Sequence, residues 1–254
     1  LEDMNRWRAR FENEIDAFVA DGPHEAGAAL DAPATVFYLA YHGMNDRKPM
    51  EALAHLFRRL CPAAEWTAPH CAAPTPPGGA RRIRLGFVSS HLEDHAVAWT
   101  LRDLMARLKE QRFEVFTFAI NRTGDVAMPE IREASDHHEI LSPLVAPARR
   151  AIAAAELDVL IFADIGMDSL CYSLAHARLA SVQCAMWGHP VTTGIPTVDY
   201  YISNDLAEPE GAEEHYSERL VRLSGVQTCY RRPKMPERDG LALPKSIPDG
   251  ATIY

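Results

Sequence analysis

Apolar residues beyond position 80 come in short runs that alternate between two kinds of spacing. The run at 157–163 (LDVLIFA) is almost wholly apolar, as in a strand buried on both faces of a sheet, whereas 113–120 alternates apolar and polar positions. Stretches with helical spacing separate these runs. The pattern predicts strands at 83–88, 113–120, 140–141, 157–163, 181–187, 200–202 and 220–223, and helices at 97–109, 126–135, 146–156 and 168–178. Such alternation favours an α/β fold, with a doubly wound parallel sheet of the Rossmann type.

The first 73 residues have a different pattern, which is helical. Large apolar side chains recur at helical spacing within 5–20 and again within 49–60, and 35–46 reads as an extended or short helical segment. The Pro- and Gly-rich stretch at 74–79 marks a boundary. We therefore expect a helical lead-in at 1–73, a Rossmann-like lobe at 80–240, and at 241–254 the start of a connection to a second lobe absent from this chain. Because the chain starts at Leu1 and stops as a strand pattern begins, we expect a piece of a longer protein.

Composition narrows the class of protein. The chain has 254 residues, with 26 Lys and Arg against 35 Asp and Glu, a net charge of −9 that does not suit a nucleic-acid coat. Hydrophobic residues make up 47% and charged residues 24%, which is typical of a globular protein with a sizeable core. No apolar run approaches the ~18–20 residues of a membrane span. The five cysteines form no C-x-x-C pair, which favours a reducing compartment, and we expect a cytoplasmic protein.

Polar loops follow four of the predicted strands. In open α/β sheets, ligands bind beyond the carboxyl ends of the strands, so these loops are where chemistry is expected. They are rich in hydroxyl groups and glycine, which suits a sugar or a phosphate. The four loops are 89–95, 121–125, 164–168 and 188–194.

Several alternative functions are disfavoured by what these loops lack. The first strand is not followed by G-x-G-x-x-G, which argues against a nucleotide-dependent oxidoreductase, and the absence of G-x-S-x-G argues against a hydrolase. His91 and His95 could bind a metal from one helix face, but no third ligand is evident, and we expect no metal site. His95 can also be interpreted as an ordinary histidine at a helix start, Trp187 as a core residue, and 137–138 as solvated surface.

The motifs are more specific in combination. V-S-S-x-x-x-x-H at 88–95 is followed by Q-C-A-M-W-G-H-P-V-T-T-G at 183–194, D-Y-Y-I-S at 199–203 and E-H-Y-S-E-R-L at 214–220. In this order they resemble the catalytic region of the O-linked N-acetylglucosamine transferase family, which includes the plant SPINDLY-type proteins. The segment F-Y-L-A-Y-H-G-x-N-D at 37–46 resembles the stretch that many bacterial members place between tetratricopeptide repeats and the catalytic region.

The resemblance implies an inverting glycosyltransferase of the GT-B type, in which two Rossmann-like lobes face each other across a cleft. Such an enzyme moves N-acetylglucosamine, or a related sugar, from a UDP-sugar to Ser or Thr of an acceptor protein, without a metal or other cofactor. This chain would be the N-terminal lobe, on the acceptor side of the cleft. The second lobe would bind UDP, and tetratricopeptide repeats would precede the lead-in.

The resemblance also implies a set of site residues. His95 matches the family histidine over the sugar–acceptor site and is a candidate general base, although the leaving phosphate could instead take the proton. The residues implied to contact substrate are Trp187, Gly188, Pro190, Thr192 and Thr193 beside the sugar, with His42 and Asn45 from the lead-in. The chain offers Arg122, Arg149 and Arg150, but none in an obvious phosphate cradle. It departs from the family pattern at His91-Leu92, Ala96-Val97 and Trp99, which leaves open a non-catalytic sugar- or protein-binding lobe of the same family.

Overall fold

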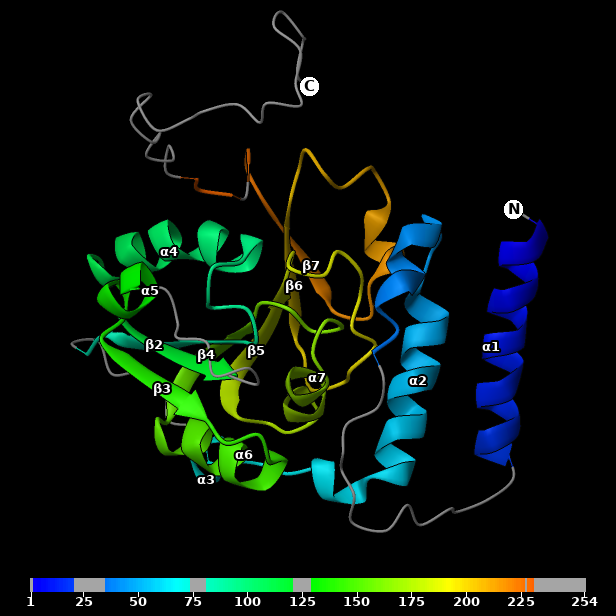
Figure 1. Ribbon diagram of the computed structural model, residues 1–254, viewed down its shortest axis with the longest axis horizontal. Coiled ribbons are helices and arrows are strands. Elements are labelled where there is room, and N and C mark those ends of the chain that lie inside the picture. The colour runs from blue at the N-terminus through cyan, green and yellow to red at the C-terminus, as the bar shows by residue number, and fades with distance from the viewer. Residues whose placement is uncertain (1, 21–34, 74–80, 121–128, 227, 231–254) are drawn as a thin grey trace, which may run out of the picture.

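A computed structural model of the chain describes residues 2–20, 35–73, 81–120, 129–226 and 228–230. Seven parallel strands form one sheet in the order β3-β2-β1-β4-β5-β6-β7. They are β1 Ile83–Ser89, β2 Phe113–Ile120, β3 His137–Leu141, β4 Leu157–Phe162, β5 Ala180–Met186, β6 Tyr200–Asn204 and β7 Arg219–Leu223. The strand order runs outward from the β1–β4 pair in both directions, which confirms the predicted doubly wound sheet (Figure 1).

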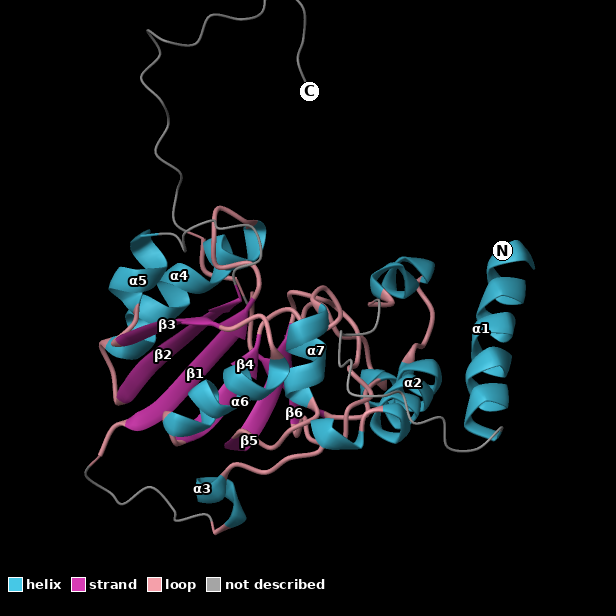
Figure 2. Ribbon diagram, turned by 60° about the horizontal axis from the view of Figure 1, so that its bottom comes forward, coloured by secondary structure: helices cyan, strands magenta, loops and turns pink. Residues whose placement is uncertain are grey.

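Four helices cover the two faces of the sheet. They are α4 Ala96–Lys109, α5 Pro129–Ala134, α6 Val145–Ala154 and α7 Ser169–Ala175. Helices α4 and α5 lie on one face, where Leu101 joins a buried cluster with Phe87, and α6 and α7 lie on the other, where Ile152 joins one with Phe162 (Figure 2). Successive residues of a strand point to opposite faces, so Ile161 and Phe162 of β4 belong to different clusters. This explains the almost unbroken apolar run of β4.

The lead-in packs against this lobe. It contains α1 Glu2–Ala20, the 3₁₀ helix η1 Phe37–His42, α2 Arg47–Leu60, the 3₁₀ helix η2 Pro62–Ala64 and α3 Pro69–Ala72. Helix α1 lies beside α2, and α2 contributes Ala54 and Phe57 to the same core as α6 and α7 (Figure 1). Gly194 has a φ of +70°, and a Cβ there would lie 2.3 Å from the carbonyl carbon of Met50. The close approach of the two backbones therefore requires glycine.

Strand β3 is longer than the sequence pattern indicated. Pairing with β2 places the Nδ1 atom of His138 2.8 Å from the Thr117 hydroxyl and leaves His138 half-buried. The expectation of solvated surface is therefore wrong for His138, whereas His137 is exposed. Polar residues are tolerated in β3 because it is an edge strand of the described sheet.

Some sequence-based expectations fall on parts of the chain that lie outside the described residues. These are the loop 121–125 with Arg122, the first residues of the 126–135 helix, and the connection at 241–254. Within the described residues, no helix combines the length and the apolar character that crossing a membrane requires.

His176, which follows α7, is a buried histidine surrounded by aromatic rings. Its ring centroid lies 4.5 Å from that of Phe57 and 5.0 Å from that of Tyr172, and neither ring nitrogen has a hydrogen-bond partner among the described residues. Burial, reinforced by the charge of Arg58, lowers the pKa of His176 to about 3. In the unfolded chain the pKa of histidine is about 6.5, so between these values the unfolded state binds more protons.

We therefore expect the free energy of unfolding to fall between pH 7 and pH 5, and His176→Phe to remove about 2 kcal/mol of that fall. The stabilising contribution of the neutral ring is complete above the unfolded pKa and is lost as the pH falls toward the folded pKa. Urea denaturation of both proteins at several pH values measures the effect. His55→Gln, on the exposed side of α2, is the control and should keep the wild-type pH dependence. The same pH dependence in His176→Phe and wild type would contradict this account.

Candidate functional site

The candidate site lies where the strand order changes direction, between the neighbouring strands β1 and β4. In open α/β sheets, ligands bind beyond the carboxyl ends of the strands at this point. The loops after β1 and β4 flank it, and the turn after β5 lies next to them because β5 pairs with β4 (Figure 2). These loops carry His95, Asp164 and Gly188. The topology therefore brings together the three described loops that the sequence singled out.

The residues that follow β4 join these loops physically. The Oδ2 atom of Asp164 accepts hydrogen bonds from Ser89 Oγ at 3.0 Å, from the backbone N–H of Ser90 at 2.9 Å and from Ser90 Oγ at 2.9 Å. On the other side, a Cβ added to Gly188 would lie 1.9 Å from the carbonyl oxygen of Ala163 and 3.4 Å from the Cα of Asp164. The loop that leads to His95 and the turn at Gly188 therefore pack against the same two residues, Ala163 and Asp164.

His95 is the N-cap residue of α4. Its Nδ1 atom accepts a hydrogen bond from the backbone N–H of Val97 at 3.2 Å, and its ring stacks on that of His91 with centroids 4.1 Å apart. Burial, followed by the charge of His91, lowers the pKa of His95 and favours the neutral ring. Because Nδ1 accepts a hydrogen bond, the proton of the neutral ring resides on Nε2. In this tautomer Nε2 is a donor, and a general-base role would require the cap to break.

The turn after β5 begins with Trp187. This residue is half-buried and packs against the α4 side of the core, whereas Pro190 is exposed. Gly188 lies between them, against the end of β4. The turn therefore presents Pro190 and part of Trp187 to solvent, beyond the carboxyl ends of the strands, where the loop with His95 also lies. Their contact with a sugar stays a prediction.

His189 was not singled out as a site residue from the sequence, yet it fixes this turn. Its Nε2 lies 3.2 Å from the carbonyl oxygen of Phe37 in η1, and its own carbonyl oxygen accepts a hydrogen bond from the Tyr201 hydroxyl at 2.8 Å. A Cβ at Gly166 would lie 2.5 Å from its Nδ1. His189 is 3% exposed, and burial lowers its pKa. His189 is part of the W-G-H-P motif, but its partner Phe37 lies 152 residues earlier in the sequence. The motif alone therefore could not reveal this contact.

The two threonines of the motif are buried, and their hydroxyls are engaged within the protein. Thr192 Oγ1 donates to Glu218 Oε2 at 2.7 Å, while the backbone N–H of Thr193 donates to Glu218 Oε1 at 2.7 Å. The hydroxyl of Thr193 also donates to Glu218. This network ties the turn after β5 to the segment before β7. It gives the threonines a structural role, and their contact with substrate stays a prediction.

His42 and Asn45 lie in the lead-in, around a buried ion pair. Arg8 NH1 is 2.7 Å from Asp46 Oδ1, and both side chains are buried. The same guanidinium contacts His42 Nδ1 at 3.5 Å and donates to the carbonyl oxygen of Asn45 at 3.1 Å. Since η1 also reaches the turn after β5 through Phe37, this cluster adjoins the candidate site. A contact of His42 and Asn45 with substrate stays a prediction.

The described part of the chain contains no cluster of metal-ligating side chains, and Arg149 makes its contacts with the lead-in. No group of three or more His, Cys, Asp or Glu side chains there is arranged to hold a metal ion. Arg149 donates to the carbonyl oxygen of Ala63 at 2.7 Å and lies over the ring of Trp66 at 4.9 Å, on the α6 side of the lobe. Its guanidinium therefore serves packing of the lead-in.

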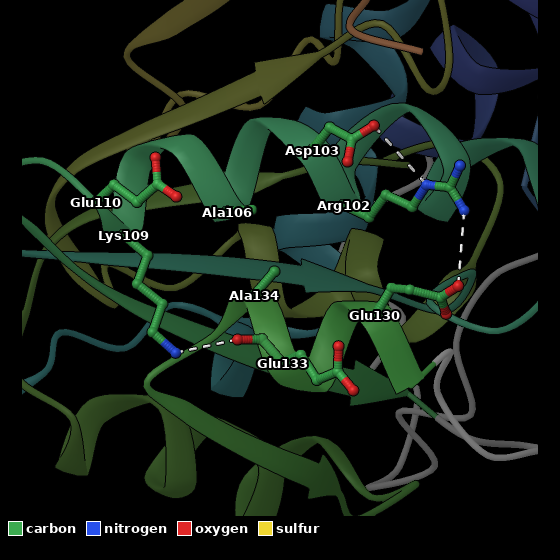
Figure 3. A pocket seen from close by; sticks show the side chains of 8 residues that line it. All are labelled: Arg102, Asp103, Ala106, Lys109, Glu110, Glu130, Glu133 and Ala134. Carbon is green, nitrogen blue, oxygen red and sulfur yellow. Dashed lines mark hydrogen bonds and ion pairs between the residues drawn. The ribbon is translucent and has the colours of Figure 1, made fainter. Parts of the chain in front are cut away.

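A separate pocket of about 440 Å³ lies between α4 and α5 (Figure 3). Arg102 lies 4.0 Å from Asp103 and 3.9 Å from Glu130, and Lys109 donates to the carbonyl oxygen of Glu133 at 3.0 Å. Arg102 thus lies near two carboxylates, and Lys109 is hydrogen-bonded to the backbone. None of the site residues expected from the sequence lines it. We therefore place the candidate site at the strand ends and not here.

Replacement of Gly188 tests the close packing at the end of β4. In Gly188→Ala the new methyl group would overlap the carbonyl oxygen of Ala163, a backbone atom that cannot move without disturbing the sheet. We expect a loss of about 2–3 kcal/mol in the free energy of unfolding, measured by urea denaturation. Gly211→Ala is the control, because Gly211 has a positive φ but open space around it, and it should lose only about 1 kcal/mol. Equal losses would show that the contact is not tight.

The chain is similar in sequence to known proteins over part of its length. The chain is 24% identical over 155 residues to a probable UDP-N-acetylglucosamine–peptide N-acetylglucosaminyltransferase, SEC of Arabidopsis thaliana, a match that covers 60% of this chain and 16% of that protein. It is 45% identical over 53 residues to the SPINDLY protein of Solanum lycopersicum, which has the same probable activity in its name, over 21% of this chain and 6% of that protein. The chain thus spans about a sixth or less of the length of these curated relatives.

A solved structure and a family model also match this chain, and both are of glycosyltransferases. A mutant O-GlcNAc transferase from Thermobaculum terrenum matches with a TM-score of 0.62 and 27% identity, covering 75% of this chain and 37% of that one. The model of glycosyl transferase family 41 matches residues 69–228, from α3 to beyond β7, and so includes all three loops of the candidate site. The chain therefore belongs to glycosyl transferase family 41.

Proposed function

We propose that this chain is the N-terminal lobe of an inverting GT-B glycosyltransferase. In this proposal the enzyme moves N-acetylglucosamine, or a related sugar, from a UDP-sugar to Ser or Thr hydroxyls of proteins. Family membership and the names of the relatives support this class of reaction. The observation that carries the proposal is that the loop bearing His95 and the turn at Gly188 both pack against Ala163 and Asp164, at the switch point of the sheet. This lobe would form the acceptor side of the cleft, and a second lobe would bind UDP.

In the proposed reaction the acceptor hydroxyl attacks the anomeric carbon from the face opposite UDP. The bond from that carbon to the phosphate oxygen breaks, and the configuration inverts. The hydroxyl proton must leave as the new bond forms, and we assign it to the departing phosphate because Nδ1 of His95 caps α4. The Nε2–H of His95 would then donate a hydrogen bond to a donor-substrate oxygen that gains negative charge.

The remaining parts of the proposal concern partners and location. The acceptor would be a protein, and tetratricopeptide repeats would precede the lead-in in the whole protein. All five cysteines are unpaired, which supports a reducing compartment such as the cytoplasm. We propose that transfer needs no metal ion, and activity that survives EDTA is the expected result.

Transfer of labelled N-acetylglucosamine to acceptor protein tests the proposal directly. We expect the whole protein to transfer the label and purified residues 1–254 to transfer none, because a cleft enzyme needs both walls. Transfer by residues 1–254 alone would contradict the assignment of UDP binding to a second lobe. A whole protein that binds acceptor but never transfers sugar would support the alternative, a non-catalytic binding lobe.

Three variants at position 95 distinguish the role of His95 as the N-cap of α4 from its proposed role as a hydrogen-bond donor in the reaction. Asn is a good N-cap residue, so His95→Asn should keep the wild-type stability but lose the Nε2 donor, and kcat should fall by about 10²-fold. His95→Gln can place an amide N–H near the position of Nε2 and should keep kcat within about tenfold. His95→Ala should lose kcat and also about 1 kcal/mol of stability.

The comparison of Gln with Asn distinguishes a hydrogen-bond donor from a general base. An amide cannot accept the proton, so a general base would make His95→Gln as inactive as His95→Ala. Unchanged kinetics in all three variants would return His95 to a purely structural role as a helix cap. Thermal unfolding of each variant provides the stability control.

A further inference from the structure

Asp164 is fully buried, although it follows β4 at the edge of the sheet where ligands bind. Taking a carboxylate out of water costs several kcal/mol unless hydrogen-bond donors replace the water. The reaction proposed above makes no use of this group. Its place in the fold therefore calls for another explanation.

Donors cover both oxygens of this carboxylate. Oδ2 accepts from Ser89 Oγ, from Ser90 Oγ and from the backbone N–H of Ser90, at 2.9–3.0 Å. Oδ1 accepts from Cys171 Sγ, in α7, at 3.1 Å. A carboxylate is an acceptor on every lone pair, so it suits four donors converging from two sides. Asp164 thus links the loop after β1 to the helix after β4.

The contacts continue from Asp164 to the candidate catalytic histidine. Ser89 Oγ, which donates to Asp164, accepts a hydrogen bond from the backbone N–H of His91 at 2.9 Å. The ring of His91 stacks on that of His95 at 4.1 Å. Three contacts, through Ser89 and His91, therefore connect the carboxylate to the His95 ring. Asp164 itself is out of reach of any substrate.

We propose that Asp164 is a positioning residue, which through Ser89 and His91 fixes the orientation of the His95 ring. The catalytic part of this proposal rests on the proposed function. The structural part does not, because the orientation of the two rings can be observed without any reaction. If the carboxylate only stabilised the fold, loss of the Ser89 donor and loss of the Cys171 donor would have the same effect on the two histidine rings.

Ser89→Ala and Cys171→Ala form a matched pair for the test. Both parent residues are fully buried, and each variant removes one donor to Asp164. Only Ser89 also holds His91. In residues 1–254, we expect Ser89→Ala to shift the imidazole NMR signals of His91 and His95, because the stacking of the rings changes. Cys171→Ala loses a contact with the backbone of Ser90 but none with His91, and it should shift those signals less than Ser89→Ala does.

Two replacements of Asp164 itself, one conservative (Asn) and one not (Ala), extend the test. The amide oxygen of Asp164→Asn can still accept from the serine side, while its NH₂ group faces the sulfur of Cys171, a weak acceptor. Because the charge of Asp164 also acts on the pKa of His95, the spectra are compared at a pH well above the pKa of histidine, where the histidine signals should stay near their wild-type positions. Asp164→Ala should displace them or unfold the chain, and if it unfolds, the Ser89 and Cys171 pair still decides the question.

Kinetics of the whole protein extend the test to catalysis. We expect Ser89→Ala to lower kcat by on the order of tenfold or more with little change in KM, because a misplaced group costs rate without loss of binding. Asp164→Asn should stay within about threefold of wild type. Unmoved histidine signals in Ser89→Ala, or equal effects of Ser89→Ala and Cys171→Ala, would overturn the proposal. If the wild-type protein transfers no sugar, the proposed function fails, and the NMR comparison still tests the positioning role.

Discussion

The hydrogen bonds to the buried carboxylate of Asp164, at the end of β4, are the interaction on which the geometry of the candidate site depends. Burying a charge is unfavourable, and this cost is offset only when the loop after β1 delivers its serine donors. Any other arrangement of that loop would leave the charge unsatisfied, at a cost of a few kcal/mol. The same two residues, Ala163 and Asp164, receive the Gly188 turn on their other side. One short segment thus determines how three loops meet.

The lead-in is part of this arrangement and not an appendage. Its η1 segment supplies the carbonyl oxygen of Phe37 to the buried ring of His189, and α2 approaches Gly194 closely enough to exclude a side chain there. Two contacts therefore hold the turn after β5 from outside the sheet. Helix α1 is joined to the same region through the ion pair of Arg8 with Asp46. The family model begins at residue 69, so most of the lead-in lies outside the matched region even though it contacts the site.

The fold could be predicted from the sequence because its signals are local. The apolar run of β4 follows from burial on both faces, and the alternation of strands and helices predicted the parallel, doubly wound sheet, although not the order of its strands. The roles of single residues could not be predicted, because they depend on partners distant in sequence. The hydrogen bonds of the Thr192 and Thr193 hydroxyls to Glu218 could not be foreseen, while their predicted place beside a sugar stays a prediction. His138 was placed on the surface because the pairing of β3 with β2 was not visible. From the sequence, Asp164 is only one polar residue of the loop 164–168, since nothing nearby in sequence indicates four donors.

The central claim is that the loop bearing His95 and the Gly188 turn form one wall of a sugar-transfer cleft. A crystal structure of the whole protein with a UDP-sugar and an acceptor peptide measures this most directly. We expect the sugar ring to lie against Gly188 and Pro190, with Nε2 of His95 within hydrogen-bond distance of an oxygen of the donor substrate. A donor sugar bound away from the carboxyl ends of β1, β4 and β5, for example in the pocket between α4 and α5, would contradict the account.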